Sequence, residues 1–208
     1  ERARMPIEFS AAVFRIGHSM IRHSYTINER TSVNRDQIFK MAGRGGFNGV
    51  GRLPEEFVVD WKKFFRSPRR GIAPNPIPSL RISPFVDLKI GAGMSIAGKN
   101  LTSGNLSGLP CAQDVEKHLT ETNPEFCSDI GLRLLSEEEI NTKFDDGSKS
   151  ILDTVDPDYG FCQKTPLWYY VLAAATAINN GDKLGPLGSL IPAETNRGIE
   201  RMTQPTVI

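Results

Sequence analysis

The chain has 208 residues, 39% of them hydrophobic, and a formal net charge of +1. This length supports one domain with a sizeable core, and the near-neutral charge gives no electrostatic attraction to nucleic acid or anionic membranes. A bilayer span needs about 18 or more consecutive apolar residues, whereas the longest apolar stretch covers only residues 167–178. The sequence therefore predicts a single domain, residues 1–208, with no nucleic-acid partner and no membrane span.

Residues 7–25 predict an amphipathic helix, and they are the most informative segment of the chain. Phe14, Gly17, His18 and Ile21 occur at i, i+3, i+4 and i+7, so they share one helix face. A polar imidazole on an apolar face needs a partner, because an unsatisfied buried polar group costs about 1–3 kcal/mol. Gly17 lets a flat group approach the backbone. The partner of His18 is therefore either a backbone carbonyl, which the spacing alone favours, or a haem iron.

Glycine and proline interrupt the next part of the chain. Residues 43–51 contain too much glycine for a helix and predict a loop. A helix is expected after Pro54, a favourable first-turn residue, with aromatic residues at 57, 61, 64 and 65 forming a stripe that predicts a buried face. Residues 67–84 predict an extended loop, since each proline biases its predecessor away from helix. A short strand is expected within residues 80–90.

The C-terminal half predicts four helices and few strands. They are expected from about Cys111 to Leu119, from the capping box of Ser136 and Glu139 to near Phe144, over residues 167–179 after a Thr165-Pro166 cap, and after Leu190–Pro192. Three cysteines, an odd number, match no metal motif. Formal glycosylation sequons begin at Asn100 and Asn105, a pattern short enough to arise by chance. The fold class predicted is mainly α with long irregular loops.

Four stretches of the sequence, in the same order, resemble the animal-type haem peroxidase superfamily, particularly its bacterial members. They are MPIEFS with FRIGHSMIR within residues 5–22, LPEEFVVDW at 53–61, GLPCAQDV at 108–115, and TPLWYYVL with LGPLG at 165–172 and 184–188. The resemblance implies a haem peroxidase-like helical domain, of which this chain is the C-terminal, proximal portion.

The resemblance also implies roles for three residues. His18 corresponds to the proximal histidine that binds the haem iron. Gln113 matches the position from which, by this comparison, an amide would accept a hydrogen bond from the second imidazole nitrogen. Arg15, one turn before His18, would pair with a haem propionate. From the residues alone, Gln113 is better explained as a solvated helix residue, and a surface arginine is the alternative for Arg15.

The function implied is a haem-dependent peroxidase, an oxidoreductase of the oxidative-stress type that uses hydrogen peroxide to oxidise a small electron donor. In the family the distal catalytic residues lie upstream of the proximal helix, and here only residues 1–4 precede Met5. We therefore expect no catalytic residue in this chain. A second chain or an upstream segment would carry the distal half, together with the ligands of any calcium ion. Family members are often exported, which favours an extracytoplasmic site.

Two alternatives remain open from the sequence. A fatty-acid dioxygenase on the same scaffold would carry a tyrosine three residues before the proximal histidine, where this chain has Arg15. A catalytically inactive peroxidase-like subunit, used for binding or assembly, would account for the missing distal residues. It would also account for Ser103, where relatives often have arginine.

Overall fold

A computed structural model of the chain describes residues 5–42, 54–65, 78–86, 88–90, 94–143, 150–155 and 157–203. These residues are mainly helical, as predicted, and their paired strands form two small two-stranded antiparallel sheets. The chain divides into two compact units, Glu1–Ser19 with Arg81–Ile208 and Met20–Leu80. The single peroxidase-like domain over residues 1–208 stays a prediction. No helix in the described part of the chain is both long and apolar enough to cross a membrane.

The larger unit contains the elements that matter for the candidate site. They are η1 (Glu8–Ala12), η2 (Val13–Met20), β3 (Lys89–Ile90), β4 (Met94–Ser95), α2 (Ile96–Leu106), α3 (Ala112–Thr122), α4 (Pro124–Asp129), α5 (Glu137–Ile140), η6 (Pro157–Tyr159), α6 (Leu167–Asn179) and α7 (Pro186–Thr203). The smaller unit contains β1 (Ser24–Thr26), β2 (Ser32–Asn34), α1 (Arg35–Ala42), η3 (Glu55–Phe57) and η4 (Trp61–Lys63).

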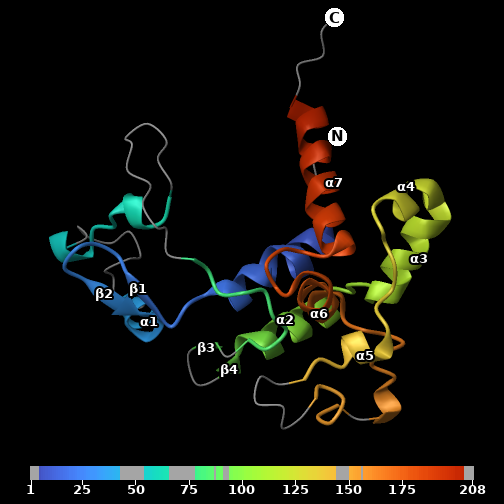
Figure 1. Ribbon diagram of the computed structural model, residues 1–208, viewed down its shortest axis with the longest axis horizontal. Coiled ribbons are helices and arrows are strands. Elements are labelled where there is room, and N and C mark those ends of the chain that lie inside the picture. The colour runs from blue at the N-terminus through green and yellow to red at the C-terminus, as the bar shows by residue number, and fades with distance from the viewer. Residues whose placement is uncertain are drawn as a thin grey trace, which may run out of the picture. The chain divides into compact units, whose positions relative to one another are not determined.

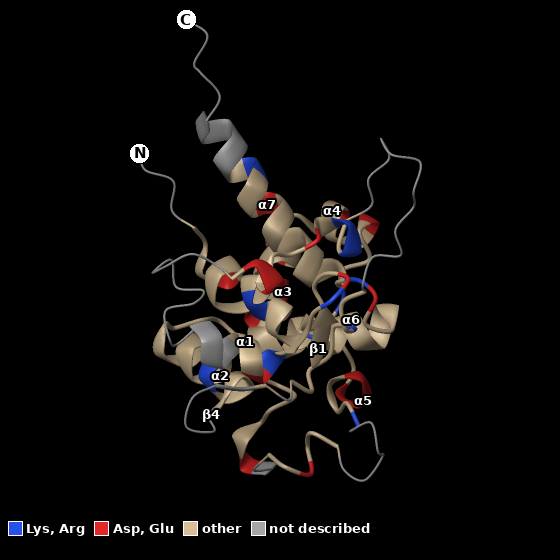
Figure 2. Cartoon of the chain, turned by 90° about the vertical axis from the view of Figure 1, so that its left-hand side faces the viewer, with Lys and Arg blue, Asp and Glu red and all other residues tan. Residues whose placement is uncertain are grey.

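Helix α6 is the centre of the larger unit. Its first nine residues, 167–175, are all buried, and η1, α2, α5 and α7 pack around it (Figure 1). The helix carries no acidic or basic residue, so it is uniformly tan in Figure 2. A helix that is apolar on all sides is stable in water only when neighbours cover it. The predicted range of residues 167–179 agrees with the observed one, although Thr165 gives no side-chain cap.

Hydrogen bonds from two tyrosines connect α6 to α5 and to the residues just before α5. The Tyr170 hydroxyl accepts from the backbone N–H of Leu135 at 2.9 Å and donates to the carbonyl of Arg133 at 3.3 Å. The Tyr169 hydroxyl donates to the carbonyl of Ile140 at 2.7 Å. Burial raises the pKa of both phenols. Each ring thus adds apolar surface to the core while its polar tip satisfies a backbone group.

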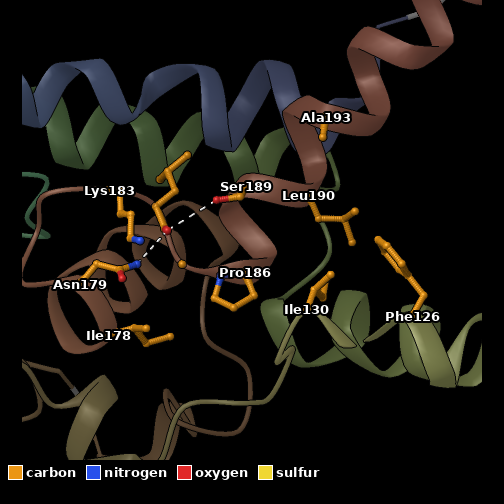
Figure 3. A pocket seen from close by; sticks show the side chains of 11 residues that line it. Phe126, Ile130, Ile178, Asn179, Lys183, Pro186, Ser189, Leu190 and Ala193 are labelled. Atoms are coloured by element: carbon orange, nitrogen blue, oxygen red, sulfur yellow. Dashed lines mark hydrogen bonds between the residues drawn. The ribbon is translucent and has the colours of Figure 1, made fainter. Parts of the chain in front are cut away.

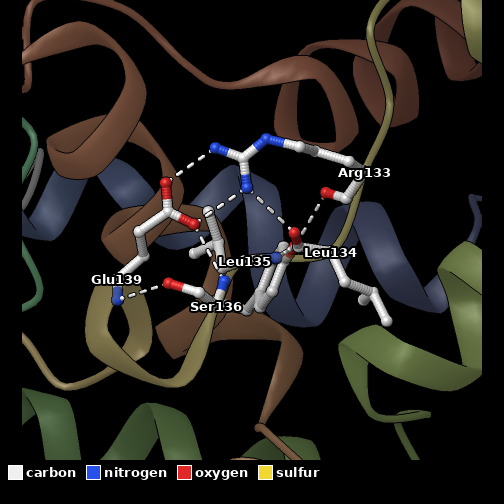
Figure 4. Close-up of polar contacts among 6 residues, drawn as sticks. Arg133, Leu134, Leu135, Ser136 and Glu139 are labelled. Atoms are coloured by element: carbon white, nitrogen blue, oxygen red, sulfur yellow. Dashed lines mark hydrogen bonds and ion pairs between the residues drawn. The ribbon is translucent and has the colours of Figure 1, made fainter.

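The predicted capping box at α5 is confirmed. Ser136 Oγ accepts from the backbone N–H of Glu139 at 3.2 Å, and Glu139 Oε2 accepts from the Ser136 N–H at 2.8 Å. Two guanidinium nitrogens of Arg133 donate hydrogen bonds to the same carboxylate, at 2.6 and 2.8 Å (Figure 4). The helix ends at Ile140, earlier than predicted, because Asn141 leaves helical geometry and its side chain accepts from the Leu152 N–H at 3.0 Å. Phe144 lies outside the described residues.

The first helix differs from the prediction in type and length. A five-residue π-helix, η1, continues into the 3-10 helix η2, and the helical segment ends at Met20 instead of continuing to Tyr25. Strand pairing is the reason for the early end, since Tyr25 lies opposite Val33 in the antiparallel β1–β2 pair. A 3-10 helix has about three residues per turn, so residues at i and i+3 share a face instead of those at i and i+4.

The prediction of a helix after Pro54 is also wrong. Only the short turns η3 and η4 form there, and Trp61 is 64% exposed instead of lying in a core. The backbone between the turns is extended at Val58 and Asp60, and two consecutive valines disfavour continuous helix. Asp60 instead caps η4, where its carboxylate accepts from the Lys62 N–H at 3.1 Å. The loop predicted at 43–51 lies outside the described residues, as does the first part, 67–77, of the loop predicted at 67–84; its described part, residues 78–84, contains no helix or strand, as predicted.

Several remaining elements extend or shift the predicted pattern. The helix predicted from Cys111 to Leu119 is α3, and the strand expected within residues 80–90 is β3. The last helix, α7, begins at Pro186 and contains Pro192, whereas the prediction placed its start after that proline. The sequence did not predict α1, α2 or α4. All three cysteines are free thiols.

We expect the Tyr170→Phe substitution to destabilise the chain by about 1–3 kcal/mol, because the buried Leu135 N–H would lose its acceptor. Urea unfolding followed by circular dichroism measures this change. Tyr159→Phe is the matched control, because Tyr159 is exposed and its substitution should leave the midpoint unchanged. Equal midpoints for wild type and Tyr170→Phe would show that this hydrogen bond contributes nothing.

Stability should also depend on pH through Glu139. Hydrogen bonds from Arg133 and from the Ser136 backbone lower the pKa of Glu139 from 4.5 to about 2. A carboxyl group with a lowered folded-state pKa stabilises the fold fully above its unfolded value, and this contribution is lost as the pH falls from 4.5 toward about 2. In urea titrations across that range, Glu139→Gln should show a shallower loss of stability than wild type. Parallel curves would contradict the expectation.

Candidate functional site

The side chain of His18 is held by a buried asparagine. His18 lies near the end of η2, and its Nδ1 lies 3.0 Å from the amide nitrogen of Asn100 on α2. Asn100 is only 2% exposed. A half-turn of an amide exchanges its NH₂ for its oxygen at the same position, so the group can serve either imidazole tautomer. The contact therefore fixes Nδ1 as the bonded ring nitrogen and orients the imidazole.

The side chain of His18 is partly exposed. Nε2 makes no hydrogen bond with any residue that the structure describes. A Cβ atom added at Gly17 would meet nothing within 4 Å, and the side chain of Phe14 is 71% exposed. Phe14 and Gly17 are three residues apart and share a face of η2, which is thus uncovered and partly apolar. A flat ligand could approach the backbone there without displacing a side chain.

The imidazole of His18 is biased toward its neutral form. Partial burial lowers its pKa, the positive charge of Arg15 lowers it further, and the hydrogen bond with Asn100 opposes both effects. Metal ligation requires an unprotonated ring nitrogen. With Nδ1 protonated and bonded to the Asn100 oxygen, the lone pair of Nε2 would be available to a metal ion.

Arg15 lies one 3-10 turn before His18, on the same side of η2. Its Nε donates to the carbonyl of Ser10 at 3.2 Å, and its own carbonyl accepts from the indole of Trp168 on α6 at 3.5 Å. Within the described part of the chain, the two terminal guanidinium nitrogens make no hydrogen bond. They could form a bidentate pair with a carboxylate. The propionate contact of Arg15 stays a prediction.

The structure contradicts the role predicted for Gln113. Its Oε1 accepts from the Thr165 N–H at 2.9 Å, and its Nε2 donates to the Cys162 carbonyl at 2.7 Å and to Thr165 Oγ1 at 2.9 Å. The first turn of α3 lies against this loop, because the Ala112 N–H donates to the Thr165 carbonyl at 3.0 Å. The hydrogen bonds of Gln113 therefore connect α3 to the segment just before α6. The amide beside His18 is Asn100.

Asn100 is the residue that sequence reasoning missed, and a signal for it was present. Ile96, Asn100 and Gly104 repeat at a spacing of four, and all three are the buried residues of α2. A polar residue on the buried stripe of a helix must have a hydrogen-bond partner. Burial at this position also leaves the sequon at Asn100 inaccessible to glycosylation.

Comparisons with protein-family models, with curated proteins and with solved structures find no match for the chain. The family assignment therefore stays a proposal that rests on the four sequence motifs and on the geometry around His18. Among the described residues, no group of three or more His, Cys, Asp or Glu side chains could hold a metal ion. A haem iron needs no such group, since its porphyrin supplies the equatorial ligands and the protein adds an axial one.

We expect Gln113→Ala to lower the free energy of unfolding by about 1–3 kcal/mol, because the Thr165 N–H would lose its acceptor. Lys117→Ala is the matched control on α3, since Lys117 is exposed and makes only a 3.9 Å ion pair with Glu121. Chemical unfolding of both variants tests this. A Gln113→Ala variant as stable as Lys117→Ala would remove the structural role assigned to the glutamine.

Proposed function

We propose that this chain carries the proximal side of a haem-dependent peroxidase site, with His18 as the protein ligand of the iron. The observation that carries the proposal is the His18–Asn100 pair, in which a buried amide holds Nδ1 at 3.0 Å and leaves Nε2 without a described partner. A histidine that serves only the core would be enclosed on both sides. His18 is instead partly exposed, and only its Nδ1 has a hydrogen-bond partner among the described residues.

The residues around His18 suit a flat, anionic metal complex. Gly17, the chain neighbour of His18, leaves space at the backbone of η2, and Phe14 on the same face as Gly17 offers an exposed apolar surface. Arg15 supplies a cation whose terminal nitrogens could pair with a propionate. When bound, the haem would supply the redox chemistry by which hydrogen peroxide oxidises a small electron donor.

The chain's own residues would tune and position the axial ligand. Asn100 would accept from Nδ1–H, which selects the tautomer that leaves Nε2 free and prevents the ring from rotating. A neutral amide is a weaker hydrogen-bond acceptor than a carboxylate, so it polarises the Nδ1–H bond less. The His18 imidazole therefore stays less electron-rich than it would beside a carboxylate. The packing of α2 and η1 against α6 keeps the two side chains in register.

Arg15 is the feature that favours a peroxidase over a lipid dioxygenase. Its position corresponds to the radical-forming tyrosine of the dioxygenase branch, and an arginine cannot replace a phenol in that chemistry. Cleavage of peroxide needs a group that moves its proton and a cation that stabilises the departing oxygen. We propose that a second chain or an upstream segment supplies both.

The test is the absorption spectrum of natively purified protein, with any companion chain retained. We expect His18→Ala to lose the Soret band and the bound iron, since the axial ligand is removed. His23→Ala and His118→Ala are matched controls, because both histidines are exposed, and these variants should retain the haem of the wild type. A normal Soret band in His18→Ala would refute the assignment.

Variants of Asn100 test its part separately. In haem-loaded protein, Asn100→Asp should make the imidazole more electron-rich and shift the Fe(III)/Fe(II) potential to a more negative value, whereas Asn100→Leu should not. Identical potentials in the two variants would show that Asn100 does not influence His18 as a ligand of the iron. A natively purified wild type that contains no haem would favour a peroxidase-like subunit used for binding or assembly.

A further inference from the structure

A pocket of about 470 Å³ opens on the larger unit, where the end of α6 and the beginning of α7 approach α4. None of its described lining residues belongs to the His18 site. Lys183, Asn179 and Ile178 lie on one side in Figure 3, and Leu190, Ile130 and Phe126 on the other. A pocket of this volume lies in the range that binds small molecules, roughly 300–1,000 Å³.

The wall formed by α4 and α7 is apolar and uncovered. Phe126 is 46% exposed, and Ile178 at the end of α6 is 40% exposed. Ile130 and Leu190 continue the same apolar surface. Large apolar side chains that converge on a concave site gain free energy when a ligand covers them. The ligand should therefore have an apolar body.

The opposite side of the pocket carries one cation. Lys183 is the only charged residue among the described residues that line the pocket. The neighbouring acid Asp182 pairs with Arg81 at 3.4 Å, so it is directed to another partner. No described residue forms a hydrogen bond or ion pair with the Lys183 ammonium group, whereas Asn179 already donates to the Leu184 carbonyl at 2.9 Å. The charged donor at this end is the lysine.

The loop that presents Lys183 is conformationally fixed. Asn180 and Gly181 both adopt positive φ, at 53° and 76°. A Cβ at Gly181 would lie 2.6 Å from the carbonyl oxygen of Ile82, so only glycine fits there. Gly185 packs against Ala174 on α6, where an added Cβ would lie 3.1 Å from the alanine methyl. The backbone that carries Lys183 is thus fixed at the pocket before any ligand binds.

We infer that this pocket binds a small monocarboxylate with an apolar body. The carboxylate would pair with Lys183, and the body would lie along Ile178, Ile130 and Phe126. A single lysine suits one negative charge, whereas phosphate groups are usually bound by several donors. The other nearby cation, Arg197, is paired with Glu194 at 3.4 Å. This inference is independent of haem binding.

The experiment is calorimetric titration of the purified full chain with decanoate, and with decanol as a matched uncharged probe. We expect decanoate to bind more tightly than decanol at low salt and to lose this advantage at high salt. Lys183→Gln should weaken decanoate binding about two- to fivefold. Lys164→Gln removes an exposed lysine that does not line the pocket, and it should have no effect.

A second variant locates the site without removing a charge. Ala193 is an exposed residue of α7 that lines the pocket, so Ala193→Phe should fill the space and weaken binding of both probes without unfolding the chain. No decanoate binding at millimolar concentration would overturn the inference. Equal binding of decanoate by wild type and Lys183→Gln would overturn the role of the cation, and unchanged binding by Ala193→Phe would place the ligand elsewhere.

Discussion

Burial of α6 is the constraint on which the rest of the larger unit depends. A helix with nine consecutive buried residues can exist in water only if other segments cover every side of it. Its aromatic residues then carry polar tips into the core, and each tip must find a partner. Trp168, Tyr169 and Tyr170 all meet this requirement with backbone groups of distant segments. Burial of one helix thus selects the positions of its neighbours.

This arrangement connects the core to the candidate site. The indole of Trp168 donates to the carbonyl of Arg15, within the 3-10 helix that carries His18. On another side of α6, helix α2 carries Asn100. Both partners in the His18–Asn100 contact are therefore placed by packing against the same helix. A hydrogen bond between side chains 82 residues apart is thus set by two segments that pack on the same helix and on each other.

Local signals in the sequence were enough where local interactions decide the structure. The range of α6 follows from its continuous apolar run, and the start of α5 follows from the reciprocal bonds of Ser136 and Glu139. Helix α2 could not be predicted from propensity, since it contains two glycines and two asparagines and is formed because it packs on the core. The family resemblance assigned the amide beside the histidine to Gln113, whose side chain bonds to the segment before α6 instead. The actual neighbour, Asn100, lies on the four-residue repeat of Ile96, Asn100 and Gly104, but its partner is identified only once the packing of α2 is known.

The two ends of α6 therefore lie at two different proposed sites. Its N-terminal part fixes the segment that contains His18, through Trp168, and its C-terminal residues Ile178 and Asn179 line the pocket beside Lys183. A 13-residue helix is about 20 Å long, so a ligand in the pocket would not touch the histidine. Because the helix between them is fully packed, each site can be formed in advance and occupied without movement of the other. The apolar run that makes α6 the core is thus also what keeps the two sites separate.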